Sequence, residues 1–204
     1  MQEKNNFVLS GTIDNDFFKS YKFELKEELN IISGDNGSGK TTFLKSICDL
    51  KKNNGTILSN KKILTYDMFS YYFSGDVLGE GDMTIRENIF YNIGYGDKGK
   101  YKYYNELLRR FNLEDYENIL YKNASEGMKQ KVHIIICLLN EARIIILDEP
   151  FNYLDKKTCL ELVLCLQEYQ KNNRALILIA TNELAILKSF RGKIFYLDMN
   201  KMLE

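Results

Sequence analysis

Continuous aliphatic runs of strand length alternate with segments of helical periodicity along most of the chain. The runs at 144–147 and 175–180 contain only aliphatic residues, which is typical of parallel strands buried on both faces. A segment with helical spacing of apolar residues stands between them at 156–169. Strands that alternate with helices predict an α/β fold with a mainly parallel central sheet.

The same patterns predict the remaining elements. Short apolar runs indicate further strands at 7–9, 21–25, 29–32 and near 193–197, and a hairpin of 56–58 with 63–66. Helical spacing predicts helices at about 42–49, 103–113, 125–139 and 184–188, and Ser125 has the character of an N-cap.

Residues 66–104 differ from the rest because tyrosine, phenylalanine and glycine are interleaved there. Two interpretations stay open at this point. The aromatic side chains can form the core of a small subdomain, or they can form a contact surface for a partner.

The segment GDNGSGKTT at 34–42 has the pattern of a phosphate-binding loop between a strand and a helix. Glycines at 34, 37 and 39 allow backbone conformations in which successive N–H groups face one anion. The N-terminus of the following helix attracts the same anion, Lys40 reaches the β and γ phosphates, and Thr41 offers its hydroxyl to Mg²⁺. The residues predicted to contact the nucleotide are Asn36, Gly37, Ser38, Gly39, Lys40, Thr41 and Thr42.

Asp148 and Glu149 follow the aliphatic run at 144–147. Ligands of open α/β sheets bind at this end of the strands. We expect Asp148 to hold Mg²⁺ together with Thr41, and Glu149 to orient and deprotonate the water that attacks the γ phosphate. A solvated acidic turn is the alternative for an Asp-Glu pair alone, and the phosphate loop upstream argues against it.

Composition narrows the choice of function. The 204 residues fit one domain, and the 28 basic and 28 acidic side chains balance. A protein with no basic excess is a poor candidate for binding nucleic acid, so we expect no nucleic-acid partner. The chain has no apolar run of membrane-span length, which predicts a cytoplasmic location. The four cysteines show no ligand spacing and are expected to be reduced core residues.

The motifs together resemble the nucleotide-binding subunit of ABC transporters. The motifs that carry the resemblance are GDNGSGKT at 34–41, ASEGMKQK at 124–131, IIILDEP at 144–150 and NYLD at 152–155. Their order and spacing cover nearly the whole chain, and the S-x-G-M-K-Q form is similar to that of small drug, peptide and bacteriocin exporter subunits.

The resemblance implies a single ATP-binding domain over 1–204, with an N-terminal antiparallel β region and a helical subdomain at about 84–139. It implies a head-to-tail dimer, either homodimer or heterodimer with another ABC ATPase, in which Ser125 and the Gly127 N–H cap the γ phosphate bound to the partner chain. The expected ligands are ATP and Mg²⁺. A separate transmembrane permease subunit would dock on the tyrosine-rich stretch and hold the chain on the inner face of the cell membrane.

The chain also departs from the family pattern. Asn182 stands where the family has a catalytic histidine, and an amide can donate to the γ phosphate but cannot become cationic, so we expect slower hydrolysis. Ala124, Glu126 and Met128 replace residues of the usual LSGGQ signature, and the Glu126 carboxylate near a phosphate is expected to weaken dimer closure.

Two further family features lack an obvious counterpart. The family glutamine that contacts the metal would fall near Ser74 or Gly75, where this chain has none. The aromatic residue that stacks on adenine has Phe17 and Phe18 as its nearest candidates.

The sequence therefore predicts the ATP-hydrolysing subunit of an ABC exporter, with Lys40, Glu149 and Asn182 as catalytic residues and a peptide, drug or lipid-like substrate. The alternative is a degenerate regulatory subunit that binds ATP and pairs with a more active ABC ATPase.

Overall fold

A sheet of parallel strands forms the centre of the protein. The computed structural model describes residues 7–26, 28–48, 53–60, 62–75, 79–94, 98–183, 188–190 and 194–198. Within them, the strands of this sheet lie in the order β6-β7-β8-β3-β9, and every neighbouring pair is parallel. The strands are β3 (Leu29–Ser33), β6 (Phe69–Tyr72), β7 (Ile144–Asp148), β8 (Leu176–Ala180) and β9 (Ile194–Asp198). The predicted parallel sheet is confirmed.

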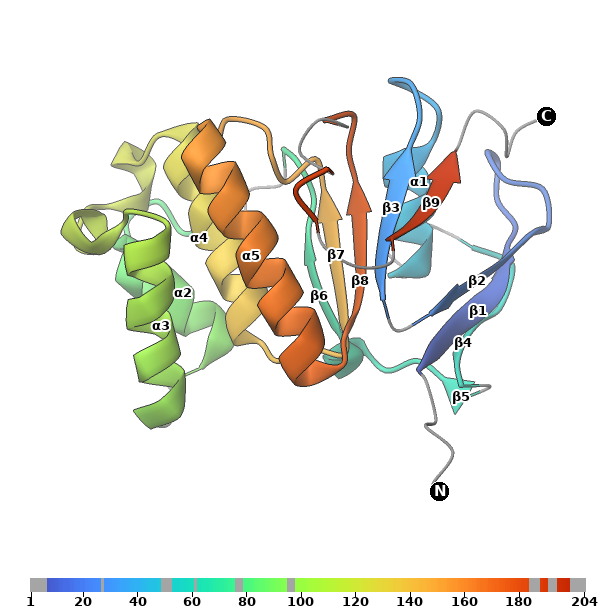
Figure 1. The fold of residues 1–204 in the computed structure, drawn as a ribbon, viewed down its shortest axis with the longest axis horizontal. Coiled ribbons are helices and arrows are strands. Elements are labelled where there is room, and N and C mark those ends of the chain that lie inside the picture. The colour runs from blue at the N-terminus through green and yellow to red at the C-terminus, as the bar shows by residue number, and fades with distance from the viewer. Residues whose placement is uncertain are drawn as a thin grey trace.

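A smaller antiparallel sheet lies beside it (Figure 1). Its order is β2-β1-β4-β5, formed by β1 (Val8–Ile13), β2 (Tyr21–Lys26), β4 (Ile57–Ser59) and β5 (Lys62–Ile63). The predicted hairpin is the β4–β5 pair. Its second strand is shorter than expected, because a 3₁₀ turn follows at Tyr66–Met68.

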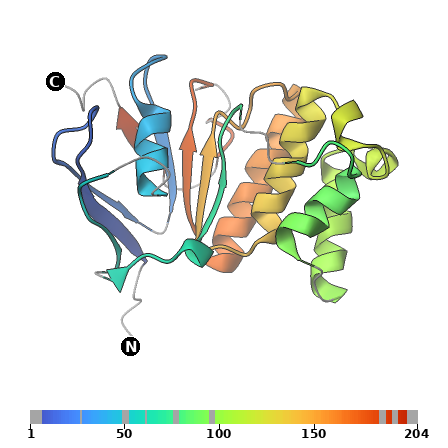
Figure 2. The ribbon, with the colours of Figure 1, turned by 180° about the vertical axis from the view of Figure 1, so that it is seen from behind.

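Helices cover both faces of the parallel sheet. Helix α1 (Lys40–Ile47) packs between the two sheets, where Phe43 and Leu44 contact alternate residues of the parallel strands. On the opposite face lie α4 (Glu126–Leu139) and α5 (Lys156–Asn173), with α2 (Ile85–Ile93) and α3 (Lys98–Arg110) packed against α4 (Figures 1 and 2). These helices share one core with the sheet. The helical subdomain at about 84–139 within the single domain stays a prediction.

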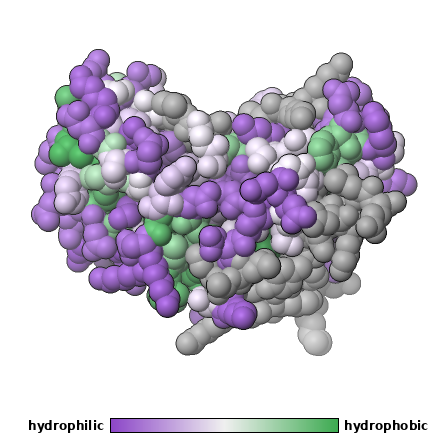
Figure 3. Space-filling view, turned by 90° about the horizontal axis from the view of Figure 1, so that it is seen from above, coloured by the Kyte–Doolittle hydropathy of each residue, from purple (hydrophilic) through white to green (hydrophobic). Residues whose placement is uncertain are grey.

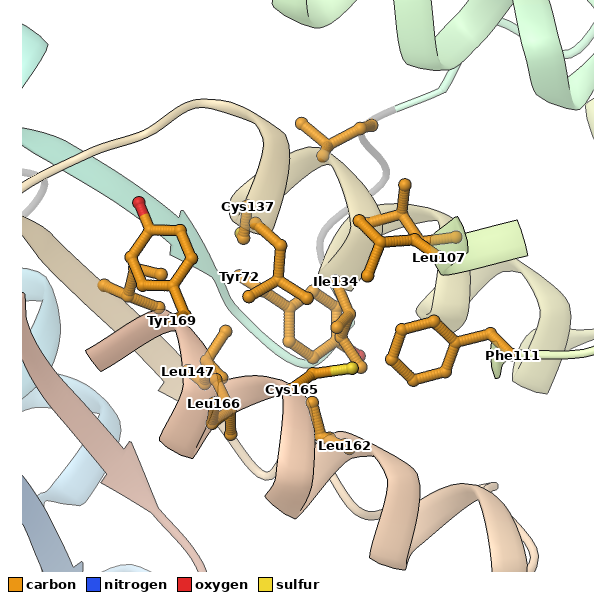
Figure 4. Packing of buried hydrophobic residues seen from close by; sticks show 14 of the residues in the cluster. Tyr72, Leu107, Phe111, Ile134, Cys137, Leu147, Leu162, Cys165, Leu166 and Tyr169 are labelled. Atoms are coloured by element: carbon orange, nitrogen blue, oxygen red, sulfur yellow. The ribbon is translucent and has the colours of Figure 1, made fainter. Parts of the chain in front are cut away.

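The core beneath α4 and α5 joins segments that are distant in sequence. Figure 4 shows Tyr72 of β6, Phe111 after α3 and Ile134 of α4 converging near Leu162 of α5. At the edge of this cluster the buried Tyr169 hydroxyl donates to the Ala142 carbonyl at 2.9 Å. Full burial of large side chains of this kind contributes about 1.5–3 kcal/mol each.

The tyrosine-rich segment contains regular structure that the sequence did not predict. Residues 69–72 form β6, and 85–93 form α2. The Thr84 hydroxyl accepts from the Glu87 N–H at 3.1 Å while the Glu87 carboxylate accepts from the Thr84 N–H at 2.8 Å, a capping box that starts α2. The buried aromatic residues of the segment are Tyr72, Phe73, Phe90 and Tyr104, whereas Tyr66 and Tyr91 are 78% and 70% exposed. The segment therefore supplies core as well as surface.

Other predicted boundaries need small corrections. The helix expected at 103–113 is α3, which ends earlier, before Asn112 adopts a left-handed φ of 52°. Helix α5 continues to Asn173. Most of the helix expected at 184–188 lies outside the described residues. Ser125 caps α4 as predicted, because its hydroxyl accepts from the Met128 N–H at 3.2 Å. All four cysteines are buried and free of disulfides.

Candidate functional site

A pocket of about 370 Å³ opens at the carboxyl ends of the parallel strands. The loop after β3 and the turn after β7 form its floor, because neighbouring parallel strands end at the same edge of the sheet. Figure 3 looks down on this edge, where the described surface is mainly hydrophilic. The residues that line the pocket are Phe17, Asn36, Gly37, Gly39, Lys40, Thr41, Thr42, Ser74, Asp148 and Glu149.

The phosphate loop has the backbone that its glycines predict. Gly37 and Gly39 have φ of 84° and 96°, in the left-handed region where a side chain would be strained. Gly39 is the N-cap of α1, so the first turn of that helix begins at the pocket. The buried Ser38 hydroxyl has no hydrogen-bond partner among the described residues. A glycine-rich loop with an unpaired hydroxyl around a positive helix end fits a polyphosphate.

Lys40 lies inside this loop. Its side chain is only 8% exposed, and its ammonium donates to the carbonyls of Gly34 at 2.8 Å and Asp35 at 3.1 Å. The loop carbonyls thus compensate the buried positive charge and hold it where a phosphate would lie.

Thr41 and Asp148 meet as predicted for a shared metal site. The Thr41 hydroxyl donates to the Asp148 carboxylate at 2.8 Å, although 107 residues separate them. Asp148 is buried at the end of β7. A hydroxyl beside a carboxylate is the hard oxygen set that Mg²⁺ prefers, with waters and phosphate oxygens as its further ligands. The residues present therefore fit Mg²⁺.

Glu149 faces the same pocket from a strained turn. Its φ of 50° is unusual for a residue with a side chain, and its N–H donates to the Ala180 carbonyl at 2.8 Å. One carboxylate oxygen lies 3.9 Å from the Lys40 ammonium, and the other accepts from the Asn182 N–H at 3.4 Å. Burial raises the pKa of Glu149, and the Asn182 N–H and Lys40 partly oppose that rise. A carboxylate with a raised pKa is suited to accept a proton near neutral pH.

Asn182 lies beside the pocket, in contact with two residues that line it. Its side-chain amide donates to the Asn36 side-chain oxygen at 2.8 Å, which joins the segment after β8 to the phosphate loop. The amide is therefore within reach of a ligand held by that loop.

Ser125 and Gly127 do not line this pocket. They begin α4, and the turn after β7 lies against them: a Cβ on Gly127 would come 2.7 Å from the Tyr153 carbonyl oxygen. The first turn of α4 and the phosphate loop of one chain thus belong to separate surfaces.

The structure also gives the location of the candidates for the two open positions. Ser74, after β6, lines the pocket where the family glutamine was expected. Phe18 is 2% exposed and packs edge-on against Phe43, whereas Phe17 is 37% exposed and contacts Gly39 at the pocket. Of the two candidates, Phe17 is the one that lines the pocket.

One buried polar residue near the site was missed. Gln130 of α4 is 2% exposed, and its amide donates to the Pro150 carbonyl at 2.6 Å. Its periodicity within α4 gives no hint of this contact, which depends on how α4 packs on the turn after β7.

Comparison with known proteins shows the family of the chain. The family model described as ABC transporter matches residues 18–152. The cytochrome c biogenesis ATP-binding export protein CcmA of Legionella pneumophila (strain Lens) is 31% identical over 166 residues, 78% of this chain and 81% of the relative. The probable peptide export ATP-binding protein YydI of Bacillus subtilis (strain 168) is 29% identical, covering 81% of this chain and 75% of the relative.

The fold agrees as well. A solved structure described as the ATP binding subunit of an ABC transporter has a TM-score of 0.82 at 26% identity, over 94% of this chain and 86% of that chain. The chain belongs to the ABC transporter ATP-binding family. Membership of this family implies ATP binding and hydrolysis and work with a transmembrane subunit. Among the described residues, none of the helices combines the length and the apolar character needed to cross a membrane.

Proposed function

We propose that this chain is the ATP-hydrolysing subunit of an exporter, in which a separate permease subunit carries a peptide, drug or lipid-like substrate. The observation that carries the catalytic part is the pocket in which Lys40, Thr41, Asp148 and Glu149 converge. Export is supported by the similarity to CcmA and YydI, which are both described as ATP-binding proteins of export.

The residues of the pocket divide the chemical work. The loop N–H groups and Lys40 hold the β and γ phosphates and oppose the charge that develops on them. Thr41 and Asp148 would hold Mg²⁺, which supplies further neutralisation of that charge when bound. Glu149 orients the attacking water and takes its proton, and the terminal phosphate leaves ADP as inorganic phosphate.

A second ABC ATPase chain, either the same chain or a relative, would complete the site. Ser125 and Gly127 lie outside the pocket of their own chain, at the free N-terminus of α4. A helix N-terminus favours an anion, so this surface suits the γ phosphate held by a partner. Closure on ATP and opening after hydrolysis would drive the permease, with the subunit bound peripherally at the inner face of the membrane.

We propose that Asn182 makes ATP hydrolysis slow. Its amide can donate to the γ phosphate, but an uncharged donor stabilises the transition state less than a cation does. In Asn182→His we expect faster turnover, and unchanged turnover would show that this position does not limit the reaction.

Steady-state ATP turnover over a wide range of protein concentrations tests the proposal. Turnover that rises more than linearly with concentration and is lost in both Lys40→Ala and Glu149→Gln supports complete sites formed by two copies. Clear ATP binding with no turnover, alone or with Asn182→His, would instead favour the regulatory subunit of a mixed pair.

A further inference from the structure

We infer that Gln130 is a positioning residue that holds the turn carrying Glu149 in its reactive conformation. The inference rests on the proposed function, because it assigns Gln130 a role in the reaction of this same pocket. Its basis is a contact between α4 and the turn after β7.

The contact is short and buried. The Gln130 amide nitrogen lies 2.6 Å from the Pro150 carbonyl oxygen and 3.5 Å from that of Glu149, so one donor faces two consecutive carbonyls. Gln130 is 2% exposed. Within the turn, the Asn152 N–H donates to the Glu149 carbonyl at 3.3 Å. Proline itself has no N–H to contribute, and Gln130 supplies the donor for the Pro150 carbonyl.

Glu149 needs such a support. Its φ of 50° places it in a region that costs about 1–3 kcal/mol for a residue with a side chain, and such a conformation persists only where its surroundings hold it. The Glu149 N–H is held by the Ala180 carbonyl on one side, and Gln130 holds the following peptides on the other. Together they direct the carboxylate between Lys40 and the Asn182 N–H.

The Gln130 amide oxygen has no partner among the described residues. A residue kept only for packing would gain from losing a buried, unpaired oxygen. The amide donor is thus the group that the site uses. Because α4 also carries Ser125 at its N-terminus, Gln130 joins the Glu149 turn of one site to the helix proposed to cap the other.

The test removes the amide donor of Gln130 and keeps an unbranched side chain of similar length. In Gln130→Met we expect kcat to fall about 10- to 100-fold, since small displacements of a catalytic group have effects of this size. The Kd for a fluorescent ATP analogue should change less than about twofold, because Gln130 does not line the nucleotide pocket.

The matched control is Asn88→Leu. Asn88 is another buried amide, 1% exposed, that donates to the carbonyls of Glu80 and Thr84, and none of the three lines the nucleotide pocket. We expect it to lower the melting temperature at least as much as Gln130→Met does while leaving kcat unchanged well below that temperature. If Gln130→Met lowers only the melting temperature, or if Asn88→Leu lowers kcat equally, Gln130 is structural and the inference is wrong.

The outcomes separate the two proposals. If the unsubstituted protein hydrolyses ATP and Gln130→Met hydrolyses it equally fast, only the positioning role is refuted. Parent protein that binds but does not hydrolyse ATP refutes the catalytic part of the proposed function and the positioning role with it. Should Gln130→Met fail to fold, Gln130→Leu gives a second donor-free variant with a shorter, branched side chain, and hydrogen exchange of the peptides at 149–154 should rise in either variant.

Discussion

Removal of the Lys129 charge offers a quantitative test of the α4 surface. Lys129 forms an ion pair with Glu126, its ammonium 2.8 Å from the carboxylate, and it lies 5.8 Å above the Tyr121 ring. The sequence alone marked Glu126 as a carboxylate that weakens dimer closure. The structure shows that a positive charge lies beside it, so Lys129→Met should uncover the repulsion between Glu126 and a phosphate bound at the helix N-terminus.

The size of this repulsion follows from the helix geometry. A carboxylate in the first turn lies about 7 Å from an anion at the helix N-terminus, roughly one turn and a bond length away. Two unit charges at about 7 Å repel by about 0.6 kcal/mol in bulk water and about 2.4 kcal/mol near a protein surface. ATP-driven association should therefore weaken about 3- to 50-fold. Glu126 is 72% exposed, so salt will move the effect toward the lower end.

The assay is the ATP concentration that gives half-maximal self-association, measured by sedimentation in a Glu149→Gln background that does not hydrolyse. We expect Lys129→Met to raise this ATP concentration. The double variant Glu126→Gln, Lys129→Met should return it to the value of the background protein. Lys122→Met removes a lysine from a different ion pair, 2.7 Å from Asp82, and should have little effect. If Lys129→Met weakens association by the same factor whether position 126 is Glu or Gln, the effect of Lys129 does not come from neutralising the Glu126 carboxylate, and the reasoning is wrong.

Three further predictions concern stability and shape. Because burial raises the pKa of Glu149, the folded protein binds a proton on this carboxylate more tightly than the unfolded chain does. Glu149→Gln should therefore raise the melting temperature near pH 8, and this gain should shrink as the pH falls. A gain in melting temperature that grows on acidification would contradict a raised pKa. Tyr121→Phe removes a buried hydroxyl 2.7 Å from the His133 Nε2 and should cost about 1–2 kcal/mol in urea unfolding, with unchanged stability as the contrary result. Gly127→Ala places a Cβ 2.7 Å from the Tyr153 carbonyl oxygen and should abolish ATP-driven association but not ATP binding, whereas Gly81→Ala, with its nearest contact at 3.4 Å, should preserve both.

Local backbone requirements explain why the pocket could be predicted from the sequence. A phosphate loop needs left-handed glycines beside a helix start, and Gly37 and Gly39 meet that need with the φ values observed. The Asp148 position follows from an aliphatic strand that must end at the ligand edge of the sheet. Both features depend on residues adjacent in sequence.

Elements that depend on distant contacts were missed. Strand β6 has the sequence FSYY, which gives no continuous aliphatic run, and its pairing with β7 makes it a strand. Helix α2 is different, because the capping box at Thr84 and Glu87 is a local sequence signal that would have predicted the start of this helix. No local pattern separates Phe17 from Phe18. Packing of Phe18 on Phe43 buries one ring and leaves the other at the pocket.

Helix α4 shows where this limit falls within a single element. The partner of Glu126 stands three residues away on the same helix face, so the spacing of the two charges could have indicated the pair, although the sequence analysis considered Glu126 alone. The partner of Gln130 is a carbonyl 20 residues away, on a turn whose position depends on β7, α5 and their packing against α4. A charge at the helix surface can therefore be interpreted from the sequence, whereas a buried amide that supports a catalytic turn becomes visible only once the backbone it holds is in place.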